Sequence, residues 1–127
     1  MTKILLIGLA GMAGTLGRYW VATAVARRDE GRLPLDTLVV NAAGCLAAGF
    51  LFHVMRERLH AGETASAVVM VGLLGGFTTF SAYALQTFVL ARDGWAGHAA
   101  LNVIASNLLG LLMVWAGHAL ARLLLPA

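Results

Sequence analysis

The chain has 127 residues, of which 60% are hydrophobic and 12% are charged, with a mean hydropathy of +0.82 and a formal net charge of +3. A soluble domain of this size needs more polar surface than this composition supplies, so we predict a protein that lies in a lipid bilayer. One cysteine excludes a disulfide framework and a structural zinc site built from cysteines, and arginines scattered between apolar blocks argue against a nucleic-acid partner.

Four apolar blocks, separated by short charged loops, are each long enough to cross the bilayer as a helix. They cover residues 4–26, 37–55, 65–90 and 97–124. A spanning helix needs about 20 mainly apolar residues to cross about 30 Å of hydrocarbon. The loops leave no room for an extramembrane domain. We therefore predict one all-α transmembrane domain over residues 1–127, with its function inside the membrane.

The basic residues of the loops do not favour one orientation of the chain in the membrane. With four spans, both termini lie on one side, and each side carries four basic residues in its loops or near the ends of its spans, with Arg18, deep in the first span, left out. The side of the termini has Lys3, Arg56, Arg58 and Arg122. The opposite side has Arg27, Arg28, Arg32 and Arg92. This balance predicts insertion in both orientations, and hence an antiparallel homodimer.

The first two spans carry small residues and isolated polar residues. Glycines at three-residue spacing in the first span allow another helix to approach closely. They are Gly8, Gly11, Gly14 and Gly17.

Arg18 lies well inside this span, where it can snorkel to the interface or face a water-filled vestibule. Asn41 stands alone among apolar residues of the second span, as interhelical hydrogen-bonding residues do. His53 and His118 lie near span ends, and we interpret them as interfacial residues rather than ligands.

In the third span, paired glycines precede paired threonines, at Gly75, Gly76, Thr78 and Thr79. Glycine is flexible, and threonine hydroxyls compete for backbone carbonyls, so we predict a break in this helix at mid-membrane. Carbonyls that such a break frees are suited to a hard cation. A kinked helix that serves packing alone is an equally supported alternative.

Two polar stripes follow the break. The stripe of hydroxyls and aromatic edges on the third span consists of Thr79, Phe80, Tyr83, Gln86 and Thr87. The stripe on the fourth span consists of His98, Asn102, Ser106 and Gly110, with Asn107 beside it. Any one of these residues can simply join helices, but neutral donors on three spans favour a shared pathway for a small ion or solute.

Acidic residues are absent from all four predicted spans. A proton-coupled exporter of the small multidrug resistance type exchanges protons for a cationic drug on a membrane carboxylate, so this alternative lacks its central residue. A non-conducting subunit of a membrane assembly is a second alternative, since it would need only the glycine packing. The sequence contains no constellation of a catalytic acid, base or metal, so we do not expect an enzyme.

The run GGFTTFS at residues 75–81 resembles the third-helix signature of the Fluc (CrcB) family of bacterial fluoride channels. The runs GMAGTLGRY at 11–19 and VNAAG at 40–44 support the resemblance, which covers nearly the whole chain. It implies a dual-topology antiparallel homodimer with two fluoride pores in the bacterial plasma membrane. Its implied function is passive, fluoride-selective export that protects the cell.

The resemblance also implies the roles of particular residues. It places Asn41, Phe80, Tyr83 and Ser106 along the fluoride pathway, and Arg18 near the aqueous vestibule. It assigns a central sodium ion to the backbone carbonyls of Gly75 and Thr78. We add Thr79 and Asn102 to the predicted pathway, because neutral donors and positive aromatic edges can replace the water around a small anion without trapping it.

Tyr83 and Asn102 depart from the family pattern, in which many relatives carry phenylalanine and tyrosine at these positions. The Tyr83 hydroxyl can donate to the ion directly. Alternatively, it can bond to Asn102 or Ser106 and orient its ring, and we favour this second role.

We expect the native chain to insert in both orientations, because neither side of the membrane outweighs the other in basic residues. A tag probed for accessibility from each side should report two populations. Adding two or three lysines to one terminus should bias the chain and lower activity, unless an oppositely biased copy is co-expressed. A single orientation of the native sequence would contradict this prediction.

Overall fold

The computed structural model describes residues 1–27 and 32–125, and it contains helices but no strand within those ranges. Arg28, one of the basic residues counted above, lies outside them. In chain order the helices are α1 (Thr2–Ala26), α2 (Leu35–Phe52), the π-helical η1 (His53–Arg58), α3 (Glu63–Ser66), the π-helical η2 (Ala67–Leu74), α4 (Gly75–Phe77), α5 (Phe80–Arg92) and α6 (Ala96–Leu124).

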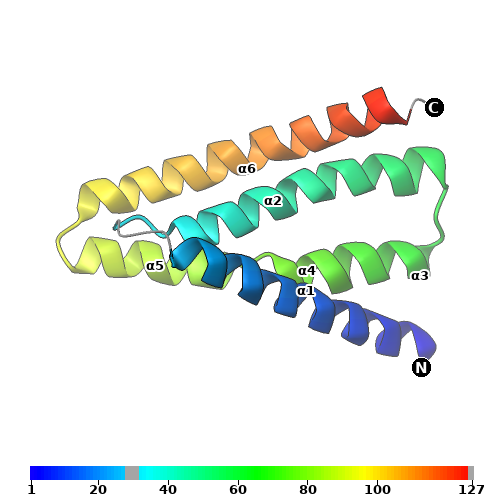
Figure 1. Cartoon of the computed structure of the whole chain (residues 1–127), viewed down its shortest axis with the longest axis horizontal. Helices are drawn as coiled ribbons and strands as arrows, with labels where there is room; N and C mark the ends of the chain where they lie inside the picture. The colour runs from blue at the N-terminus through cyan, green and yellow to red at the C-terminus, as the bar shows by residue number, and fades with distance from the viewer. Residues whose placement is uncertain (28–31, 126–127) are drawn as a thin grey trace.

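Within the described residues, these elements make four helical rods that are long and apolar enough to cross a bilayer. The rods are Thr2–Ala26, Leu35–Arg58, Glu63–Arg92 and Ala96–Leu124. The predicted all-α fold with four spans is therefore confirmed. Figure 1 shows α2 and α6 side by side, with α1 against the rod formed by α3 to α5.

The third rod is broken where the paired threonines stand. Thr78 has φ −84° and ψ 158°, and Thr79 has φ −147° and ψ 113°, so both residues are extended between α4 and α5. Figure 1 shows this link as a thin stretch of chain. The Thr78 hydroxyl donates to the Leu74 carbonyl at 3.0 Å, and the Thr79 hydroxyl accepts from the Ala82 N–H at 3.2 Å. Threonine side chains thus end one helix and cap the next, and the predicted break is confirmed.

Glycines set the distance between the two pairs of neighbouring rods. A Cβ atom on Gly14 would overlap the Leu73 carbonyl oxygen, and one on Gly76 would overlap the Gly11 carbonyl oxygen. Gly49 and Gly117 allow the same backbone-to-backbone approach between α2 and α6. The predicted packing role of the first-span glycines is confirmed for Gly14, and its partner is the third rod.

Gly14→Ala should destabilise the protein, because the new methyl group can fit only if α1 moves away from η2. Overpacking of this kind costs about 1–3 kcal/mol. We expect the apparent melting temperature in detergent, followed by tryptophan fluorescence, to fall by about 5–10 °C. Gly8→Ala is the matched control on the same helix, since no atom lies within 4 Å of a Cβ at Gly8. Equal melting temperatures for the two variants would contradict the packing role.

Candidate functional site

A cavity of about 250 Å³ lies beside the break in the third rod. It brings together five of the seven predicted pathway residues, contributed by α2, the extended link, α5 and α6. Its lining consists of Asn41, Cys45, Thr78, Thr79, Phe80, Tyr83, Ser106 and Asn107. The polar groups around this cavity are neutral amides and hydroxyls, together with two aromatic rings.

Asn41 holds the broken backbone with both ends of its side-chain amide. Its Nδ2 donates to the Thr79 carbonyl oxygen at 3.0 Å, and its Oδ1 accepts from the Thr79 N–H at 2.8 Å. A Cβ atom on Gly44, one turn along α2, would overlap the Thr78 side chain, so glycine at this position lets α2 come close to the break. Asn41 therefore lines the cavity and also replaces the hydrogen bonds that Thr79 loses by leaving the helix.

The break also changes which backbone carbonyls have partners. In a continuous α-helix, the N–H groups of Thr79 and Ala82 would bond to the carbonyls four residues earlier, at Gly75 and Thr78. Here Thr79 N–H donates to Asn41 and Ala82 N–H donates to the Thr79 hydroxyl. The carbonyls of Gly75 and Thr78 thus lose their helical donors. Gly75 is exposed and Thr78 is half-buried.

The aromatic part of the cavity lies on the first turn of α5. The Phe80 and Tyr83 rings are tilted by 57°, with their centroids 5.4 Å apart, and Phe80 is 79% exposed. The Tyr83 hydroxyl accepts a hydrogen bond from Asn107 Nδ2 at 3.3 Å. The prediction that this hydroxyl bonds to Asn102 or Ser106 was wrong. The antiparallel register of α5 and α6 sets Tyr83 opposite Asn107.

Asn102 is nearly fully buried and lies behind the cavity rather than in its lining. Its Nδ2 donates to the Thr87 hydroxyl at 2.8 Å, and that hydroxyl donates to the Tyr83 carbonyl at 2.8 Å. The Ser106 hydroxyl donates to Asn102 Oδ1 at 3.4 Å. Asn102 therefore joins α5 to α6 and positions Ser106, which does line the cavity.

Arg18 lies at a second cavity, of about 340 Å³, between α1, α2 and α5. Asp36 and Gln86 also line it, so its wall carries both signs of charge and an amide. Within the described chain, Gln86 Oε1 is buried without a hydrogen-bond partner. Thr79 lines both cavities, which places the extended link between the charged space and the neutral one.

Asn41→Leu should loosen the extended link, because Thr79 would lose the partners of both its backbone polar groups. Each unsatisfied buried group costs about 1–3 kcal/mol. We expect faster amide hydrogen exchange in residues 78–83 and a lower melting temperature in detergent. Asn107→Leu is the control, since the amide it removes bonds to a side chain and to its own helix rather than to the link. If amide hydrogen exchange in residues 78–83 were the same in Asn41→Leu as in the native protein, Asn41 would not hold the extended link.

Comparison with known proteins gives a consistent result over nearly the whole chain. Residues 5–118 match the family described as CrcB-like protein, Camphor Resistance (CrcB). A protein of Solibacter usitatus named fluoride-specific ion channel FluC is 43% identical over 122 residues, covering 94% of this chain and 98% of that protein. Proteins of the same name from Nitratidesulfovibrio vulgaris and Methylobacillus flagellatus are 40% and 35% identical, covering 97% and 100% of this chain and 99% and 100% of their own lengths. The chain therefore belongs to the CrcB-like family, as the GGFTTFS resemblance implied.

Proposed function

We propose that this protein is a fluoride-selective channel that exports fluoride passively and so protects the cell. The observation that carries the proposal is the cavity at the break, which is lined by neutral donors and aromatic rings in a family whose relatives are named fluoride channels. A bacterial plasma (inner) membrane is the location that suits four apolar spans and this function.

The lining suits a small anion that gives up its water. The Tyr83 oxygen accepts from Asn107, and this bond orients the Tyr83 ring at the wall of the cavity. The positive ring edges of Phe80 and Tyr83 add further weak attraction. Weak, neutral contacts hold an anion long enough to replace water and still release it, which conduction requires.

The conducting unit we propose is an antiparallel homodimer. The equal numbers of basic residues on the two sides allow both orientations in the membrane. In a single chain the aromatic ring of Phe80, which lines the cavity, is 79% exposed. A second chain that covers this face would complete the pathway wall. Each of the two chains would contribute one such cavity, which agrees with two pores per dimer.

A structural sodium ion at the dimer centre fits the carbonyls of Gly75 and Thr78. These oxygens have lost their helical donors, and unwound backbone carbonyls are known ligands of Na⁺. The ion would supply a fixed positive charge between the two broken helices. Asn41 and the Thr79 cap keep the carbonyls free of helical partners, whether or not the ion is bound.

The two alternatives account for less of the structure. A proton-coupled exporter would need a carboxylate deep in a span, but Asp36, Glu57 and Glu63 lie within the first or last two residues of their rods. A non-conducting assembly subunit would explain the glycine packing, but it gives no role to the two cavities that meet at Thr79. An enzymatic role likewise finds no support in the neutral lining of the cavity.

Purified protein in liposomes should release fluoride and retain chloride. Within this assay, Phe80→Ile and Tyr83→Ile should each reduce the initial fluoride efflux strongly, because an aliphatic group offers no positive edge and dewets the path. Tyr83→Phe should remain conductive, because the ring edge survives. The measurement is initial efflux through a fluoride electrode at equal protein density.

Empty liposomes are the control for leakage, and size-exclusion profiles confirm that each variant is folded. Equal fluoride and chloride release by the native protein would reject the proposed function. If Tyr83→Phe lost as much flux as Tyr83→Ile, the hydroxyl would donate to fluoride rather than orient the ring. Native flux in both isoleucine variants would remove these rings from the pathway.

A further inference from the structure

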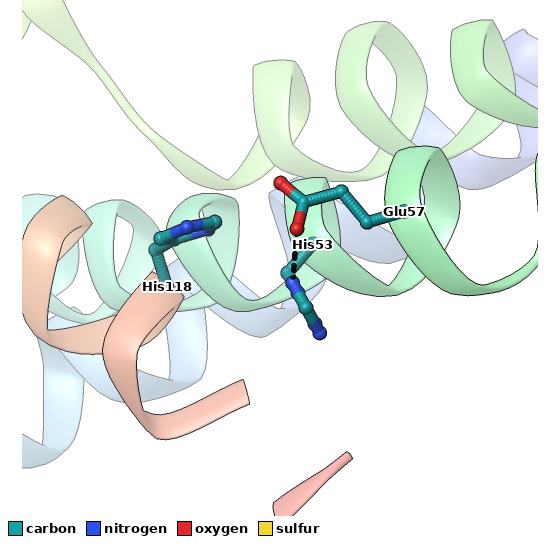
Figure 2. A group of neighbouring side chains, drawn as sticks. All are labelled: His53, Glu57 and His118. Atoms are coloured by element: carbon teal, nitrogen blue, oxygen red, sulfur yellow. Dashed lines mark hydrogen bonds and ion pairs between the residues drawn. The ribbon is translucent and has the colours of Figure 1, made fainter. Parts of the chain in front are cut away.

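Two histidines and a glutamate come together at the end of the molecule remote from the loop between α5 and α6. His53 and Glu57 lie four residues apart on η1, and His118 belongs to the last third of α6. Their ligand-type atoms all lie within 4.8 Å of one another. Figure 2 shows His118 on the neighbouring helix, with its ring beside the His53 and Glu57 pair.

The hydrogen bonds of His53 define which of its nitrogens faces the group. Nε2 lies 3.0 Å from the Leu125 carbonyl oxygen, and because a carbonyl only accepts, Nε2 carries the hydrogen. Nδ1 lies 2.8 Å from a carboxylate oxygen of Glu57. In the neutral imidazole, Nδ1 then presents a lone pair to a carboxylate that also presents lone pairs, so a cation must lie between them.

We propose that this cation is a divalent transition-metal ion of the Zn²⁺ class, bound by His53 Nδ1, a Glu57 carboxylate oxygen and a ring nitrogen of His118. Two imidazoles, one carboxylate and a water molecule form a common tetrahedral zinc set. Metal-bound histidines typically donate their second ring N–H to a carbonyl, as His53 does to Leu125. The alternative cation is a proton shared by His53 and Glu57.

The geometry needs only a small adjustment to hold the ion. Zinc bonds of about 2.0–2.1 Å place tetrahedral ligand atoms about 3.3 Å apart. The His53 and Glu57 atoms, 2.8 Å apart, must therefore separate by about 0.5 Å, and His118 must approach by no more than about 1.5 Å. His118 can make this movement, because no hydrogen bond to its ring is present within residues 1–27 and 32–125. Its described contacts are with the rings of His53 and Phe52, at centroid distances of 5.5 and 6.3 Å.

The surroundings favour binding but limit its strength. His53 is 1% exposed, and His118 lines an apolar cavity with Phe52, so the group is sheltered from bulk water on two sides. η1 is π-helical from His53 to Arg58, and π-helical segments are frequent at functional sites. The positive charges of Arg56 and Arg58 on the same element oppose a cation, so we expect micromolar rather than nanomolar affinity. A bound ion would fasten the end of α6 to the end of the second rod.

The test measures Zn²⁺ binding to purified protein from which any polyhistidine tag has been removed. Competition with a chromophoric chelator should give one zinc ion per chain with micromolar Kd. His118→Ala should raise Kd at least tenfold, since it removes one ligand. Glu57→Gln should do the same. Zinc should also raise the melting temperature of the native protein but not of His118→Ala.

His98→Ala is the matched control, because His98 lies near the other end of the same helix and contacts Trp95 instead. The control should keep native affinity, and Mg²⁺ at equal concentration should not compete. X-ray absorption of the zinc-loaded native protein should show imidazole ligands without sulfur, which excludes Cys45. The proposal is overturned if no zinc binds, or if both ligand variants retain native Kd. Because no flux is measured, either result is independent of the proposed channel function.

Discussion

The pair of hydrogen bonds between the Asn41 amide and the Thr79 backbone is the interaction on which the rest of the site depends. A bilayer offers no water to a backbone that leaves its helix, so each freed N–H and carbonyl needs a partner within the protein. Asn41 supplies one donor and one acceptor to a single residue, at 3.0 and 2.8 Å. The extended link can therefore exist inside a span, and the cavity beside it has a fixed wall.

That interaction in turn requires close contact between rods, which the glycines provide. Gly44 leaves space for the Thr78 side chain, so α2 can bring the Asn41 amide within hydrogen-bonding distance of the link. Gly14 and Gly76 bring α1 to the other side of the same rod, backbone against backbone. Between helices surrounded by lipid, such contact is the main source of packing energy. The small residues therefore act on the cavity indirectly, through the position of the broken helix.

The spans and the break could be predicted because each depends on a local property of the chain. Hydropathy over a single segment identifies a span, and the glycine and threonine pairs weaken the helix in which they occur. The partners of Asn41, Tyr83 and His53 could not be predicted, because they depend on how two helices are aligned. Tyr83 meets Asn107 rather than Asn102 because α5 and α6 run antiparallel in that register. His118 is distant from His53 and Glu57 in sequence, so the cluster of these three side chains becomes visible only in the folded structure.

The site has a part that the fold fixes and a part that can vary. The backbone of Thr79 is bound by Asn41, its hydroxyl caps α5, and the residue lines both cavities. A substitution of Thr79 would therefore affect both the folding of the link and the proposed pathway. Phe80 and Tyr83 instead project from a helix that is already capped, and neither ring helps to hold the extended link. Their chemistry can therefore change without loss of the break. In the proposed pathway, the backbone would determine where the ion passes, and the side chains of α5 would determine how strongly it is held there.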